Sequence, residues 1–264
     1  MLRSLLNDLP EWTLALLFIG GTVAVTLAAF VLVRRFLESW RDTSSVEGVV
    51  AVAAMVMTLF ALVLAFVVVN LYNDYSNAST DVVDEANALG AVVQDVQALP
   101  VRSRQAIESA IARYVVEVRA REFSELAHGT RDPAAQRRAA DVFAAVQRAK
   151  PATDTQGVFY RAAADQLNTF LAERENRIAK AGTSIPPPLL GLMVFLGIGT
   201  IVVFLLIRTH HPGLDIALIV TVAVVVASGL MTALILQYPY SGSIAVQSDP
   251  FTHGALSQLP PPAS

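Results

Sequence analysis

The stretch that decides the fold runs from Glu47 to Leu99: EGVVAVAAMVMTLFALVLAFVVVNLYNDYSNASTDVVDEANALGAVVQDVQAL. Its first part, Gly48 to Val69, contains no charged residue. At about 1.5 Å per residue, a helix of this length crosses the ~30 Å hydrocarbon core of a bilayer. The composition then turns polar with no proline before Pro100. The stretch therefore predicts one long helix that leaves a membrane and continues into water.

The polar half of this helix repeats apolar residues at alternating intervals of four and three. Such heptad spacing is typical of helices that pack against partner helices in water. We therefore expect this half to belong to a helical bundle. The residues of the repeat are Val82, Ala86, Leu89, Val93 and Val96.

The overall composition favours a membrane protein. The chain has 264 residues, of which 54% are hydrophobic and 16% are charged, whereas soluble domains carry about 25% charged residues. The net charge is −3 with no basic run, which argues against nucleic-acid binding. The absence of cysteine excludes disulfides and thiolate catalysis.

Three further segments are long and apolar enough to span a membrane: Trp12–Val33, Leu189–Ile207 and Ile216–Gln237. The first is longer than the core of a signal peptide and is followed by Arg34 and Arg35, so we interpret it as a transmembrane helix. None of the four spans contains an ionisable residue. Proton relays and ion-coupled transporters need such groups, so this absence argues against active transport.

The region between the second and third spans reads as a four-helix bundle. After the polar half of the long helix, helices are predicted over 101–126, 134–149 and 158–181, joined by short loops. The expected fold is an all-α membrane protein with four transmembrane helices and this bundle inserted between spans 2 and 3. The expected parts are 1–72 (spans 1 and 2), 73–185 (bundle), 186–237 (spans 3 and 4) and 238–264 (C-terminal tail).

The basic residues give a weak signal for orientation. Short loops weigh most in the positive-inside rule, and their arginines favour a cytoplasmic location for the two short loops. We therefore expect a multi-pass protein of the plasma (inner) membrane with its bundle outside the cytoplasm. The short-loop residues are Arg34, Arg35, Arg41 and Arg208, and those on the opposing side are Arg3, Arg174, Arg177 and Lys180.

Several motifs resemble those of bacterial membrane proteins of unknown function called bestrophin-like. They are LAFVVVNLYNDYSNA (64–78), DEANALG (84–90), LP (99–100), RYV (113–115), YPYSGSIAV (238–246) and DPF (249–251). The chain departs from the family pattern at Thr43-Ser44-Ser45 and at Gln237. The motif residues for which the resemblance implies a structural role are Glu85, Asn87, Pro100, Tyr114, Pro239 and Gly242.

The resemblance implies kinship with bestrophins, which are oligomeric anion channels whose second span lines the pore. Bestrophins carry their bulk in the cytoplasm, which conflicts with the orientation inferred from the arginines. The second span offers one candidate stripe, Phe60, Leu64 and Val67, where a hydrophobic constriction could gate by dewetting. Ordinary contact with lipid or helices is the alternative. Asn70 at the exit of the span is either an ion contact or a solvated amide.

Two carboxylates just beyond the membrane form a second candidate. Asp81 and Glu85 are four residues apart and share a helix face. Their spacing could hold a divalent cation, or make a charged ring if subunits assemble around an axis. The alternative is a solvated face, or ion pairs with Arg174, Arg177 and Lys180 of the returning helix.

Two functional hypotheses follow. The first is a passive, oligomeric, bestrophin-like ion (anion) channel. The second is a non-conducting scaffold or sensor whose bundle, residues 73–185, binds a partner or ligand. No phosphate loop or HExxH motif occurs, so we expect no enzyme, cofactor or metal site. The expected partners are the lipid bilayer and further copies of the chain, not nucleic acid.

Overall fold

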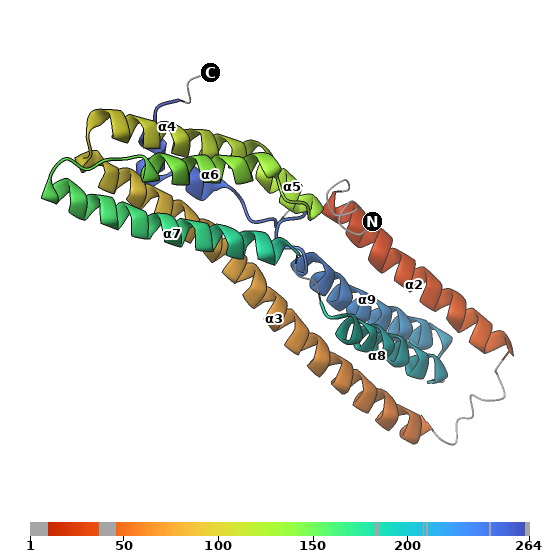
Figure 1. The fold of residues 1–264 in the computed structure, drawn as a ribbon. Helices are drawn as coiled ribbons and strands as arrows, with labels where there is room; N and C mark the ends of the chain where they lie inside the picture. The colour runs from red at the N-terminus through yellow and green to blue at the C-terminus, as the bar shows by residue number, and fades with distance from the viewer. Residues whose placement is uncertain are drawn as a thin grey trace. The chain divides into compact units, whose positions relative to one another are not determined.

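The computed structural model describes residues 10–36, 46–182, 185–207, 209, 211–242 and 244–261. Within these residues all regular structure is helical (Figure 1). The chain divides into two compact units. The membrane unit comprises Met1–Asn73 and Ser184–Gln237, and the polar unit comprises Asp74–Thr183 and Tyr238–Ser264.

Four of the described helices are long and apolar enough to cross a membrane, as the sequence predicted. They are α2 (Glu11–Phe36), α3 (Val46–Asp95), α8 (Pro187–Leu206) and α9 (Pro212–Leu236). Helix α3 is unbroken over 50 residues and contributes to both units. The Thr43-Ser44-Ser45 departure lies outside the described residues.

Apolar side chains hold the membrane unit together. Phe60 of α3 is 3% exposed and lies in one cluster with side chains of α8 and α9. Gly229 of α9 permits close approach, since a Cβ there would collide with Cδ2 of Leu64. Phe30 anchors α2 in a third cluster. The buried members of these clusters are Phe30, Leu205 and Ile219; Phe60, Leu196, Val222 and Val226; and Val67, Leu71, Ile185, Met193 and Ala233.

The polar unit contains the rest of α3 and a series of shorter helices. Proline and glycine explain several of its helix ends. Pro100 precedes the first turn of α4, and Gly129 ends α5 with a φ of 78°. The elements are η3 (Val96–Ala98), α4 (Val101–Glu117), the π-helix η4 (Val118–Glu122), α5 (Phe123–His128), α6 (Pro133–Gln147), α7 (Asp154–Gly182), η5 (Asp249–Thr252) and η6 (Gly254–Gln258).

Among the described residues of the polar unit, the buried apolar side chains form one main core. All five residues of the predicted heptad repeat are at most 6% exposed, which confirms the predicted buried face of α3. Residues of the C-terminal tail join the same core, among them Tyr240, Phe251 and Leu256. The tail is therefore a packed part of the polar unit.

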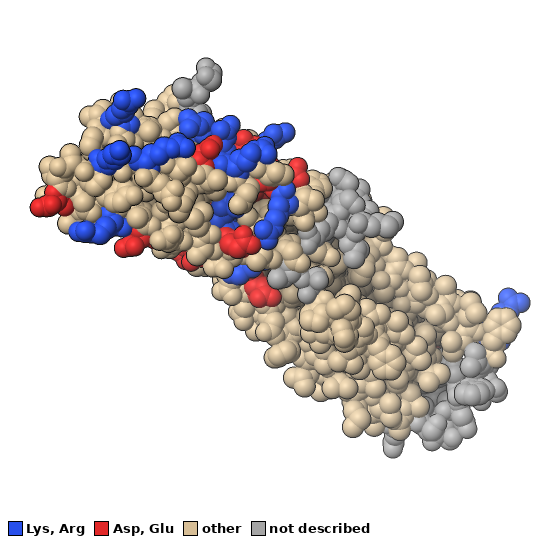
Figure 2. Space-filling view, in the orientation of Figure 1, with Lys and Arg blue, Asp and Glu red and all other residues tan. Residues whose placement is uncertain are grey.

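Charge follows the division into units. On the face seen in Figure 2, acidic and basic side chains gather over the polar unit, whereas the described residues of the membrane unit show little charge. Residues 74–99 of the polar unit contain five carboxylates and no lysine or arginine. Two of these carboxylates, Asp81 and Glu85, are buried.

Candidate functional site

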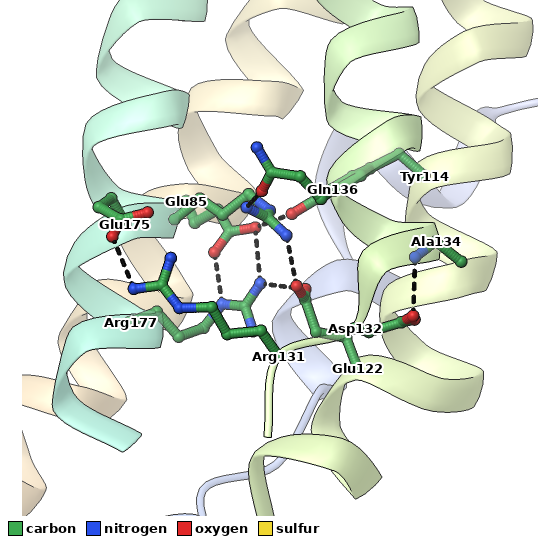
Figure 3. A network of polar contacts seen from close by, with 10 residues as sticks. Glu85, Tyr114, Glu122, Arg131, Asp132, Ala134, Gln136, Glu175 and Arg177 are labelled. Carbon is green, nitrogen blue, oxygen red and sulfur yellow. Dashed lines mark hydrogen bonds and ion pairs between the residues drawn. The ribbon is translucent and has the colours of Figure 1, made fainter. Parts of the chain in front are cut away.

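The most unusual feature of the polar unit is a buried network of charged side chains (Figure 3). Glu85 comes from α3 and Glu122 from the end of η4, while Arg174 and Arg177 lie one turn apart on α7. Tyr114 of α4 completes the group. Each of these five side chains belongs to a residue that is at most 4% exposed.

Arg177 is the centre of the network. Its Nε donates to Oε2 of Glu85 at 2.6 Å, and its Nη2 donates to Oε2 of Glu122 at 2.6 Å and to Oε1 of Glu85 at 3.3 Å. The Tyr114 hydroxyl donates to Oε1 of Glu85. One guanidinium therefore joins carboxylates from two different helices, and charge-assisted bonds of this kind are among the stronger hydrogen bonds in proteins.

Arg174 extends the network towards α6. Its Nη2 pairs with Oε1 of Glu122, and its Nη1 donates to Oε1 of Gln136 at 2.6 Å. The guanidinium carbon also lies 6.0 Å from the ring centroid of Tyr114. Two arginines thus face two glutamates, so the buried charges balance.

Aromatic rings connect the network to the C-terminal tail. The Arg177 guanidinium carbon lies 5.2 Å from the ring centroid of Phe123, within cation–π range. Phe123 in turn makes edge contacts with Tyr240 and Phe251 at centroid distances of 6.1 and 6.4 Å. The packing of the tail and the ionic network therefore share one aromatic neighbour.

The electrostatics fix the protonation of two members of the network, Tyr114 and Arg177, at neutral pH. Burial, together with the Glu85 carboxylate, raises the pKa of Tyr114 well above its ordinary value. Burial alone would lower the pKa of Arg177, but the Glu85 carboxylate and its neighbours raise it well above its ordinary value. Tyr114 is therefore a neutral donor and Arg177 a permanent cation.

The side chains of the network are buried. The five side chains bond to one another, and no group of three or more potential metal ligands occurs among the described residues. Nη1 of Arg177 and Nε of Arg174 are buried without a hydrogen-bond partner among the described residues. The contacts of the network join α3, α4, η4, α6 and α7, as a clamp would.

The structure places the two predicted carboxylates in ion pairs with the returning helix, which was one of the alternatives for them. Glu85 pairs with Arg177, and Oδ2 of Asp81 lies 2.6 Å from Nζ of Lys180. Glu85 is fully buried and Asp81 is 7% exposed. Neither carboxylate is displayed to solvent by the chain.

The predicted stripe on the second span faces the interior of the membrane unit. Phe60 and Val67 are 3% and 2% exposed, and Leu64 is half-buried against α9. Asn70 is exposed, and its side-chain amide donates to the Phe66 carbonyl at 2.8 Å. The four residues therefore do not share one environment.

The remaining motif residues lie on the surface of α3, at a helix start and in a turn. Asn87 is exposed on α3, and Pro100 stands at the start of α4. The Pro239 carbonyl accepts a hydrogen bond from Val246 N–H at 2.8 Å, and Gly242 has a φ of 80°, which favours glycine. Pro239 and Gly242 lie in the turn that follows α9.

Glu122 is the member of the network that the sequence reasoning missed. It lies four residues after Val118 and so continues the apolar stripe of the preceding helix. A carboxylate at a position of the apolar stripe is the signal that could have found Glu122. Burying an unpaired charge is costly, so a carboxylate on a buried face implies a positively charged partner. The π-helical turn that carries it is a type of irregularity often found at functional sites.

Comparison with known proteins identifies the family. A family model described as the bestrophin-like domain matches residues 20–251. Two variants of a bacterial bestrophin homologue from Klebsiella pneumoniae resemble the structure with TM-scores of 0.68 and 0.66 at 12% and 11% identity. The matches cover 93% and 92% of this chain and 96% and 95% of the homologues.

A third solved structure, of a membrane protein, has a TM-score of 0.63 at 12% identity. The match covers 93% of this chain and 95% of the chain of that membrane protein. A comparison with curated proteins finds no match. At these identities the structural likeness concerns the fold, and the family model carries the assignment. The chain belongs to the bestrophin-like family.

Proposed function

We propose that this chain is one subunit of an oligomeric, passive ion channel in a lipid bilayer. The observation that carries the proposal is the bestrophin-like family match over residues 20–251, because known members of the family are membrane ion channels. The family is one of channels rather than enzymes. The four apolar helices supply the membrane anchorage that a channel subunit needs.

The proposal places α3 nearest the oligomer axis. Its outward stripe is then the candidate lining of the ion path, because the opposite stripe with Phe60 and Val67 packs on α8 and α9. The outward stripe recurs every three or four residues, is apolar and would gate by dewetting in a narrow pore. Its residues and exposed fractions are Met55 (74%), Leu59 (48%), Leu62 (67%), Phe66 (67%) and Val69 (58%). Asn70 flanks it, whereas Leu64 packs with Phe60 and Val67 on the opposite face.

The sign of the transported ion is the first quantity to measure. The family resemblance implies anions. The part of α3 beyond the membrane displays the exposed carboxylates Asp74 and Asp84, and residues 74–99 contain no basic residue. Rings of carboxylates favour cations. A ring built from Asp81 and Glu85 would first require their ion pairs to open.

The test is ion flux from liposomes that contain the purified protein, with chloride and potassium measured separately and oligomeric mass measured in parallel. Phe66→Ala is expected to change the rate of flux, while Asp84→Asn is expected to change the chloride-to-potassium ratio. Phe60→Ala is the matched control: it should lower stability, with little effect on the flux of each folded channel. Flux that responds to Phe60→Ala but ignores Phe66→Ala would contradict the outward stripe. A flux-silent monomer or dimer would contradict the channel.

The finer architecture is part of the same proposal. The polar bundle, residues 73–185, is inserted between spans 2 and 3, between the membrane segments 1–72 and 186–237, and is followed by the tail, 238–264. We place the bundle outside the cytoplasm in the plasma (inner) membrane. The chain contains no cysteine, so a single Asp141→Cys variant, at an exposed residue of α6, can be labelled in intact cells with an impermeant maleimide. Labelling that occurs only after lysis would show that the bundle lies in the cytoplasm and would contradict the proposed orientation.

A second candidate function is a non-conducting sensor or scaffold. The observation that favours it is a cavity of about 650 Å³ in the polar unit, between α3, α4 and the tail. Its lining is mostly polar and includes Gln94, Gln97, Glu108 and Gln258. A polar ligand or partner segment would suit this lining. A flux-silent protein of low mass would favour this candidate.

A further inference from the structure

A groove in the membrane unit combines an apolar wall with two arginines. It has a volume of about 660 Å³ and lies between α2 and the first turns of α9. This volume is within the range of about 300–1,000 Å³ that is typical of small-molecule sites. Its lining residues are Leu27, Phe30, Val31, Arg34, Arg35 and Ile216.

The helical period explains why these residues share a groove. Leu27, Phe30, Val31 and Arg34 follow at intervals of three, one and three residues, so they form one face of α2. Phe30 is 3% exposed and packs towards α9, whereas Val31 is 61% exposed. The face thus provides an anchored inner wall and an open outer edge.

The charge of the groove has one sign. Arg34 and Arg35 are exposed and occupy the last turn of α2, and no lining residue carries a carboxylate. Asp215, at the start of α9, is not a lining residue; its Oδ1 accepts a hydrogen bond from Thr209 N–H at 2.7 Å. An anion at the mouth of the groove would meet two guanidinium groups.

The dimensions suit an amphipathic ligand. Leu27 and Arg34 are seven positions apart, so the apolar wall extends about 10 Å along the helix from the basic end. In a membrane-spanning helix, that wall lies beside acyl chains and the arginines lie at the level of the headgroups. Arginine pairs well with phosphate through two parallel hydrogen bonds.

We propose that this groove is a binding site for an anionic phospholipid. The lipid phosphate pairs with Arg34 and Arg35, and one acyl chain lies along Leu27, Val31 and Ile216. The site takes a lipid rather than free phosphate because only a lipid fills the apolar wall. The inference is independent of ion conduction, since it needs only the helices of the membrane unit.

The test is lipid titration of the purified, delipidated full chain in detergent, followed by native mass spectrometry. Phosphatidylglycerol and phosphatidylcholine with identical acyl chains are compared. We expect one phosphatidylglycerol per chain to bind at least tenfold more tightly than phosphatidylcholine. Arg34→Gln/Arg35→Gln should weaken phosphatidylglycerol binding roughly 30-fold, the equivalent of about 2 kcal/mol.

Two further variants separate a built site from general attraction to charge. Val31→Trp fills the groove and keeps both arginines, so it should also weaken phosphatidylglycerol binding. Arg102→Gln/Arg137→Gln removes two exposed arginines of the polar unit and should leave binding unchanged. If Val31→Trp lowers the unfolding midpoint, Ile216→Trp fills the groove from the α9 wall, since Ile216 is 43% exposed.

Three results would overturn the proposal. Lipid binding that depends on Arg34 and Arg35 but ignores both groove-filling variants would indicate general surface attraction. Displacement of the lipid by equimolar inorganic phosphate would indicate an anion site without a lipid chain. Loss of lipid binding on oligomerisation, with recovery in the monomer, would show that a second copy of the chain covers the groove.

Discussion

Replacing Glu85 with alanine is the sharpest test of the buried network. The change removes the acceptor of two Arg177 contacts, at 2.6 and 3.3 Å, and of the Tyr114 hydroxyl. Arg174 and Arg177 then share the single carboxylate of Glu122. The balanced network becomes one with an uncompensated buried positive charge.

The magnitude follows from that imbalance. Removing one partner of a buried ion pair costs about 3–5 kcal/mol, mostly because the other charge stays buried. For a protein of this size, each kcal/mol lowers the unfolding midpoint by about 2–4 °C, so the expected loss is about 6–20 °C. Glu85 is fully buried, so solvent does not screen the effect.

The assay is thermal unfolding of the purified full chain in detergent, followed by helical circular dichroism. The matched control is Asp84→Asn, because Asp84 precedes Glu85 on the same helix but is exposed. A surface change of this kind alters stability by less than about 0.5 kcal/mol. Equal midpoints for Glu85→Ala and Asp84→Asn would refute the assignment of a buried clamp.

A charge-balanced double variant tests the reasoning independently. Glu85→Leu/Arg177→Met removes both partners and leaves Glu122 paired with Arg174. Replacing a buried ion pair with apolar residues of similar volume is often neutral. We expect the double variant to recover at least half of the lost stability. A double variant no more stable than Glu85→Ala would show that shape, rather than charge balance, dominates at this site.

Three other predictions concern the polar unit. Burial and the Glu85 carboxylate raise the pKa of Tyr114, so the folded chain keeps a proton that the unfolded chain releases above about pH 10. The stability that comes from this proton is fully present below about pH 10. Above that pH, the free energy of unfolding falls by up to about 1.4 kcal/mol per pH unit. Unfolding midpoints in alkaline buffers should therefore fall less steeply for Tyr114→Phe, and equal slopes would contradict the prediction. Phe251→Ala should cost about 3–5 kcal/mol because Phe251 is 1% exposed in the core, whereas Ile244→Ala, at a residue 39% exposed, should cost less than about 1 kcal/mol in the same thermal assay; similar losses would mean that the tail does not pack as described. Glu175→Gln breaks an exposed pair with Arg131 at 3.0 Å and should change the free energy of unfolding by less than about 1 kcal/mol, so a larger shift in denaturant unfolding would contradict the surface assignment.

The sequence was sufficient to predict the helices because their signals are local. The four apolar spans were found where hydropathy placed them, and the heptad of α3 from Val82 to Val96 is buried as its spacing required. The family motifs also predicted the family that the domain match identifies. Periodicity and composition act over a few turns of chain, so a single sequence contains them.

The environments of individual side chains were harder to predict, because they depend on distant partners. Glu85 and Arg177 are 92 residues apart, and only folding shows that they meet. Asp84 and Glu85 are neighbours with similar chemistry, yet one is exposed and the other fully buried. The two side chains point to different faces of the helix, but the helical period alone does not tell which face packs against an arginine.

This difference decides which residues can report on conduction. Loss of flux in Glu85→Ala would not distinguish a pore contact from an unfolded polar unit, because the same change removes a buried counter-charge. Phe60→Ala carries a similar ambiguity, since Phe60 of α3 packs against α8 and α9. Asp84 and Phe66 are exposed on the same helix, so changes there can alter an ion path with little cost in stability. A function on the outward face of α3 is therefore best tested through residues that the fold does not need.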